Sequence, residues 1–163
     1  MQMTDLQDLM VENLKDLYSA EQQMLKAMPK VAKATENEEL RAAFEQHMQE
    51  TQTHIQRLEQ IFQQLGEKPT GKKCKGMEGL LEEGKEMMEE DADPDVLDAA
   101  MISSAQRIEH YEIAAYGTLR TYARQLGLEK HAELLQRTLD EEGETDKLLT
   151  QIAESRVNVE AED

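Results

Sequence analysis

Apolar residues recur every three or four positions in four long segments of this 163-residue chain. That spacing places the apolar side chains on one face of an α-helix, and such a face must be buried against other helices. Ala, Leu, Glu, Gln, Lys and Met, which lose little freedom on entering a helix, are frequent here. The sequence therefore predicts an all-α protein with one core, in which residues 1–156 form a single domain.

Local signals place the first two helices. The first is expected over about residues 4–33, with Pro29 kinking it or ending it early because proline lacks the backbone donor. Thr35 and Glu38 resemble a capping box that opens the second helix, and Gly66 ends it. The link between the two helices is short, so they should lie side by side and antiparallel.

The second half repeats this arrangement after a long connection. Residues 67–92 break the pattern and then recover a short amphipathic helix. Asp93 and Pro94 begin a third helix that runs towards Leu126, and a fourth follows at once and reaches Ile152. Two antiparallel pairs joined by one long crossover predict a ferritin-like four-helix bundle. Residues 157–163 are expected to form an acidic, solvated tail.

The charge of the chain narrows its partners. There are 35 acidic and 18 basic residues, for a formal net charge of -17, which disfavours nucleic acid and anionic membranes and favours cations. No apolar run approaches the roughly 20 residues of a membrane span, and the N-terminus does not resemble a signal peptide. We therefore expect a cytoplasmic protein. The single cysteine, Cys74, lies in a basic stretch and is interpreted as an incidental surface thiol.

All four apolar stripes become polar near their midpoints. Burying unpaired carboxylates is costly, and bound cations would offset that cost. Carboxylates together with imidazoles favour transition metals over calcium. The sequence therefore predicts two iron or manganese ions. The candidate ligands are Glu21, His47, Glu50, His54, Glu109, Glu112, Glu142 and Asp146.

These candidates have a simpler interpretation. A single glutamate at a core position is often a side chain that reaches solvent, and His47 and His54 could each be hydrogen-bonded core residues. The apolar pattern is interrupted at a matching depth in all four helices, and this coincidence favours the metal site. His110 and His131 lie off the inward series and are expected at the surface.

Several segments resemble the DUF892 or YciF-like family of bacterial ferritin-like proteins, and the resemblance covers nearly the whole chain. The segments are DLYSAEQQMLKAMPKVAKAT, AFEQHMQETQTHIQRLE, KCKGMEGLLEEG, SAQRIEHYEIAAYGTL and LDEEGETDKLL. The resemblance implies a ferritin-like, typically homodimeric bundle linked to stress responses. Its motif residues fall on Glu21, His47, Glu50, Glu109, Glu112, Glu142 and Asp146. Ferritin and rubrerythrin relatives use Glu-x-x-His on two helices, and this chain departs from that pattern.

Two functions follow from these observations. The first is a metal-binding stress protein, an oxidase or peroxide scavenger, in which Glu50 and Glu142 bridge or chelate two ions and Glu21 and Glu109 are terminal ligands. In that scheme His47 or His54 supplies nitrogen. The second is a non-catalytic helical interaction module that has kept the bundle and lost the metal chemistry.

Overall fold

The computed structural model describes residues 2–163, and within them the chain is helical without any strand. The predicted all-α class is therefore confirmed. The helices are α1 (Leu6–Ala34), α2 (Glu38–Leu65), α3 (Lys75–Met88), α4 (Pro94–Gln125), α5 (Glu129–Ile152), a π-helical turn (Ala153–Val157) and α6 (Asn158–Glu160). Among the described residues, no helix combines the length and the apolar character needed to cross a membrane.

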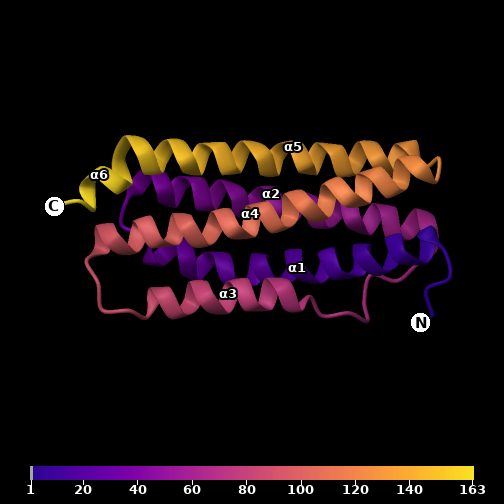
Figure 1. Cartoon of the computed structure of the whole chain (residues 1–163), viewed down its shortest axis with the longest axis horizontal. Coiled ribbons are helices and arrows are strands. Elements are labelled where there is room, and N and C mark those ends of the chain that lie inside the picture. Colours follow the sequence, from indigo (N-terminus) through magenta and orange to yellow (C-terminus); the bar gives the residue numbers. More distant parts are fainter. Residues whose placement is uncertain (1) are drawn as a thin grey trace.

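Four of the helices form a bundle, and α3 lies outside it. The pairs α1/α2 and α4/α5 are antiparallel hairpins that pack on each other, while α3 runs along the outside against α1 and α4 (Figure 1). The connection that contains α3 carries the chain back along the bundle, so α2 and α4 run in the same direction (Figure 1). The predicted crossover with a short extra helix is thus present.

The helix ends follow from local hydrogen bonding. Asp5 caps α1 by accepting the backbone N–H of Asp8, and Asn37 caps α2 by accepting that of Leu40. The expectation that Thr35 caps α2 is wrong, because its hydroxyl donates to the Val31 carbonyl at 2.8 Å instead. Gly66 ends α2 with a φ of 68°, a left-handed conformation that glycine adopts without strain. Proline does not end α1, which continues to Ala34.

Two apolar clusters fill the bundle on either side of its middle. One includes Leu14, Leu17, Leu58, Phe62 and Leu119. The other includes Leu40, Phe44, Ile102, Leu149 and Ile152. Burying each such side chain contributes about 1.5–3 kcal/mol. Apolar burial towards the two ends of the bundle therefore stabilises the fold. The middle of the bundle can then carry polar groups.

The crossover is packed more tightly than its sequence suggested. Cys74 is fully buried rather than at the surface, which corrects the sequence interpretation. Its backbone N–H donates to Ser19 Oγ at 2.9 Å and its carbonyl accepts from Gln23, so the start of α3 is fixed to α1. Burial raises the pKa of the Cys74 thiol, although Tyr111 lies 3.1 Å from the sulfur and acts in the opposite direction. The lysines that flank it in sequence therefore do not activate it.

Two other surface expectations also differ from the structure. His131 is 7% exposed, because it lies in the first turn of α5 beside the core residues Ala132 and Leu135, and burial lowers its pKa. Val157 is 1% exposed and packs in the same cluster as Ile152, so the solvated segment does not begin there. An apolar residue one or two turns after a helix can continue its buried stripe. His110 is exposed, as expected.

Candidate metal centre

Six acidic and histidine side chains meet in the middle of the bundle, between the two apolar clusters. Each has a relative exposure of 4% or less. They come from all four bundle helices: Glu21 from α1, His47 and His54 from α2, Glu109 and Glu112 from α4, and Glu142 from α5. These six are among the eight candidates from the sequence.

The six residues form two overlapping groups of four. Glu21 and His54 belong to one group and His47 and Glu109 to the other, while Glu112 and Glu142 belong to both. Within each group, one nitrogen or oxygen atom from every residue lies within 4.8 Å of the others. We call the two ends of this cluster the Glu21–His54 side and the His47–Glu109 side.

Helical spacing explains why one cluster has two sides. His47 and His54 are seven residues apart, which is two turns of α2, so both face inward at different depths. Their ring centroids are 6.3 Å apart. Glu109 and Glu112 are three residues apart and share one face of α4. Two histidines at different depths therefore each meet a different set of carboxylates, and the two sets share Glu112 and Glu142.

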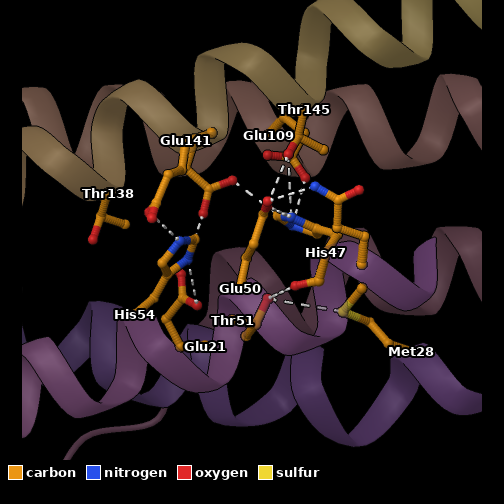
Figure 2. Close-up of polar contacts among 12 residues, drawn as sticks. Glu21, Met28, His47, Glu50, Thr51, His54, Glu109, Thr138, Glu141 and Thr145 are labelled. Carbon is orange, nitrogen blue, oxygen red and sulfur yellow. Dashed lines mark hydrogen bonds and ion pairs between the residues drawn. The ribbon is translucent and has the colours of Figure 1, made fainter. Parts of the chain in front are cut away.

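On the Glu21–His54 side, the imidazole is enclosed by carboxylates. His54 Nδ1 lies 3.0 Å from a Glu142 oxygen and 3.7 Å from a Glu21 oxygen. Its other nitrogen, Nε2, lies 3.4 Å from Glu141, as Figure 2 shows. The two terminal guanidinium nitrogens of Arg57 in turn donate to Glu141, at 2.6 and 2.9 Å. The chain Arg57, Glu141, His54 fixes the ring and leaves Nδ1 facing the cluster.

On the His47–Glu109 side, the roles of the two ring nitrogens are exchanged. His47 Nε2 lies 2.8 Å from Glu109 and 3.7 Å from Glu142. Nδ1 faces outward, 3.5 Å from Glu50 and 3.4 Å from the Thr145 hydroxyl (Figure 2). Thr145 also donates to Glu50 at 3.4 Å. Glu50 and Thr145 therefore hold this ring from behind, as Glu141 does for His54.

Two of the eight candidates lie outside both groups. Glu50 has a side chain that is 27% exposed and contacts the outward nitrogen of His47. Asp146 has a side chain that is 20% exposed and lies 3.1 Å from the exposed His110. The structure brings Glu112 into both groups instead of Glu50. Sequence reasoning missed Glu141 and Arg57, although Arg57 follows His54 by three residues and so shares its face of α2.

The protons in the cluster are distributed unequally. Burial alone would lower the pKa of both histidines, but Glu109 raises the pKa of His47 well above its usual value and Glu142 raises that of His54 to about 10. Burial and the Glu142 charge raise the pKa of Glu109 and Glu112. Burial opposes ionisation of Glu142, yet its contacts with Glu109 and His54 lower its pKa. In the absence of metal, these directions favour protonated imidazoles and an ionised Glu142 beside protonated carboxyl groups.

The donor set fits a pair of metal ions. The oxygens of Glu21, Glu112 and Glu142 are buried, and among residues 2–163 their only ion-pair partners are the two imidazoles, which pair with Glu21 and Glu142 but not with Glu112. The Tyr116 hydroxyl is also buried without a hydrogen-bond partner among these residues, and its ring centroid lies 6.2 Å from that of His54. Buried polar atoms are normally paired, so unpaired oxygens that converge on one point indicate a ligand. Glutamate oxygens and imidazole nitrogens are the donors that iron and manganese accept.

The chain is similar in sequence to a known protein family. Residues 5–162 match the family model described as "Domain of unknown function (DUF892)". Protein YciF of Escherichia coli (strain K12) is 47% identical over 163 residues, which cover 99% of this chain and 98% of YciF.

Solved structures extend the likeness to the fold. The crystal structure of the E. coli stress protein YciF superposes with a TM-score of 0.92 at 46% identity, covering 96% of this chain and 99% of that one. YcfI of Rhodopseudomonas palustris, for which a structural role has been suggested, gives 0.90 at 41% identity, covering 93% and 97%. A protein of Xanthomonas campestris pv. campestris shares the fold at 23% identity, with a TM-score of 0.78 and 97% of both chains covered.

Proposed function

The chain belongs to the DUF892 family, and we propose that it is a ferritin-like bundle that binds two transition-metal ions, iron or manganese, at mid-bundle. One observation carries the proposal: the two groups of four share Glu112 and Glu142. Two carboxylates common to two sets of ligands are what a pair of bridged ions requires. Both oxygens of Glu112 are buried without a partner among residues 2–163, which supports this arrangement.

Each residue of the cluster then has a distinct role in the proposed metal centre. Glu112 and Glu142 lie between the two positions, and Glu21 with His54 and Glu109 with His47 complete them. Arg57 with Glu141, and Thr145 with Glu50, hold the two imidazole rings from behind. The protons on Glu109, Glu112 and both histidines leave when these groups act as ligands, because only deprotonated forms bind metal. With iron bound, the centre would supply one-electron chemistry towards oxygen or peroxide.

The relatives suggest where such chemistry would be used. E. coli YciF is described as a stress protein. A centre that consumes oxygen or peroxide suits that setting, so we propose a role in the bacterial stress response. Assembly as a homodimer and a cytoplasmic location stay predictions. Light scattering of the purified protein, and fractionation of the source cells, test these two.

Metal content tests the central proposal. The double variant Glu112→Gln/Glu142→Gln keeps side-chain size and removes the charges shared by both positions. We expect elemental analysis to give about two ions per chain for the native protein after loading with Fe²⁺ or Mn²⁺, and nearly none for the variant. The control, Glu38→Gln/Glu45→Gln, makes the same change of charge at partly or fully exposed positions of α2. Equal metal content in both variants contradicts the proposal.

A non-catalytic structural module is the second candidate. The metal-free cluster is already stabilised internally, because His47 pairs with Glu109 at 2.8 Å and His54 with Glu142 at 3.0 Å. The structural role suggested for YcfI points the same way. This candidate predicts a folded protein whose melting temperature does not change when Fe²⁺ or Mn²⁺ is added, and the same metal content for the native chain and the double glutamine variant.

A further inference from the structure

A cavity of about 340 Å³ lies beneath α3, between that helix and the α1 and α4 helices of the bundle. Its size falls in the range of sites that hold small molecules, about 300–1,000 Å³. Figure 1 shows α3 running alongside α1 and α4. The wall of this α3 cavity is mainly apolar, and its larger side chains include Met24, Met28, Phe44, Leu81, Met88 and Met101.

The packing of α3 makes the cavity a fixed feature of the fold. Gly76 lies so close to α4 that a Cβ atom there would be 2.7 Å from the Tyr111 ring. Gly84 is buried, and a Cβ atom there would meet Ser104 at 3.7 Å. Two positions without a side chain, eight residues apart on α3, therefore let that helix lie close against α4. The cavity lies along the segment that begins just after Gly76.

The two ends of the cavity differ in chemistry. Its inner end is lined by His47, Glu109 and Thr145, so it reaches the His47–Glu109 side of the cluster. Its outer rim includes Lys26 and Lys30 of α1 and Lys85 of α3, all of which are exposed.

The charge of the rim is unusual for this chain. The protein carries a net charge of -17, yet three lysines border the α3 cavity. None of the three forms an ion pair with another residue in the described range 2–163. Three acidic residues also line the cavity: Glu109 at its inner end, Glu82, and Glu78, which is paired with Lys73 outside it. The rim therefore offers unpaired positive charge at the mouth of an apolar space.

We propose that the α3 cavity binds a free fatty acid, with the carboxylate at the Lys26, Lys30 and Lys85 rim and the alkyl chain lying under α3 towards His47 and Glu109. An apolar channel with a cationic mouth fits a single-chain anionic amphiphile, and methionine side chains adapt readily to a flexible chain. This site goes beyond the metal centre and does not depend on it.

Calorimetric titration of the full chain with straight-chain carboxylates tests the proposal. From hexanoate to decanoate, kept below their micelle concentrations, the affinity should rise about fourfold for each added methylene, which is the factor for burying one CH₂ group. Decanol, which lacks the charge, should bind more weakly than decanoate, and decyltrimethylammonium should not bind. Affinity that does not depend on chain length, or binding to anionic phospholipid vesicles in place of free decanoate, overturns the proposal.

Two variants locate the site. Lys26→Glu/Lys30→Glu should weaken decanoate binding about tenfold, whereas Lys68→Glu/Lys130→Glu makes the same charge change at exposed lysines away from the cavity and should have little effect. Ala105→Phe fills the cavity and should abolish binding, while Ala114→Phe, exposed on the same helix, should not. Equal affinities for the two double variants overturn the proposal, even if Ala105→Phe fails to fold.

The outcome is separable from that of the metal experiment. Neither lysine variant alters a group in the cluster, so their metal content should equal that of the native chain. Loss of fatty-acid binding at the rim with normal metal content therefore supports this site alone. The Glu112→Gln/Glu142→Gln variant should still bind decanoate.

Discussion

The two sides of the cluster use the same kinds of donor but differ in their surroundings. On the Glu21–His54 side both named residues are fully buried, and the outward ring nitrogen meets Glu141, which is held by Arg57. On the His47–Glu109 side, both residues line the α3 cavity. One side is thus enclosed by the bundle, while the other borders a space that opens to the surface. The comparison suggests a position that retains its ion and a position that exchanges it.

Removing one histidine at a time is the strongest test of the difference between the two sides. We expect His54→Gln and His47→Gln each to lower the metal content from about two ions per chain to about one, because each imidazole belongs to only one group. The remaining ion should exchange slowly in His47→Gln and quickly in His54→Gln. Elemental analysis and the rate of transfer to a coloured chelator measure both effects.

The exposed histidine offers a control for this experiment. His110→Gln alters a histidine that contacts only Asp146 among the candidates and should leave about two ions. Loss of both ions from either single variant would mean that the two sides are one cooperative site.

The pH dependence of stability gives the next largest effect. In the metal-free fold, the Glu142 and Glu21 carboxylates outweigh burial and raise the pKa of His54 to about 10, and the pKa of His47 is also raised. The folded chain then holds more protons than the unfolded chain above the usual histidine pKa of about 6.5, so stability falls as the pH rises towards 10. The raised pKa values of Glu109 and Glu112 act in the same direction above about pH 4.5.

Melting curves of the metal-free protein measure this slope. Between about pH 6 and pH 9 the melting temperature should fall by roughly 5–10 °C, which corresponds to a few kcal/mol. The metal-loaded protein should show the opposite trend, because deprotonation favours the ligands. His54→Gln should flatten the metal-free slope. A metal-free melting temperature that rises over this range would contradict the assigned protonation.

Loss of the Arg57–Glu141 contact to the outward nitrogen of His54 should have a smaller effect on metal binding. Arg57→Gln removes the group that holds Glu141 and should weaken the ion on the Glu21–His54 side by about 10- to 100-fold while leaving the other ion unchanged. Competition with a chelator of known affinity measures this. Arg124→Gln is the matched control, since that arginine is exposed and α4 carries it away from the cluster. Equal weakening of both ions would show that Arg57 acts on the whole bundle.

Periodicity explains what the sequence could predict. Glu21, His47, His54, Glu109 and Glu142 each interrupt an apolar stripe, and a helix has only one inward face, so their burial could be inferred. Glu112 also follows the inward series of its helix, three residues after Glu109, whereas Glu50 lies to the side of the series that contains His47 and His54 and could not be ranked in the same way. How far α2 and α4 are rotated about their axes decides which one enters the cluster, and helix packing sets that rotation.

The crossover was less predictable for a related reason. Cys74 stands in a basic, irregular stretch that has no periodicity, and its burial comes from contacts with Ser19, Gln23 and Tyr111 on other helices. Tertiary contacts of this kind leave no local signal in the sequence. The α3 cavity is unpredictable in the same sense, since its wall is assembled from five separate helices.

The smallest expected effect concerns the route by which an ion leaves. Ala105 lines the α3 cavity, and Ala105→Phe should slow removal of the ion on the His47–Glu109 side several-fold, because a bulky ring narrows the space that borders that ligand pair. The ion on the Glu21–His54 side should be removed at its native rate. Ala114→Phe adds the same ring at an exposed position of α4 and should change neither rate. Stopped-flow transfer to a chelator resolves two phases if the positions differ. A single phase in the native protein, unchanged by Ala105→Phe, would mean that both ions leave by opening of the bundle and that the cavity is not their route.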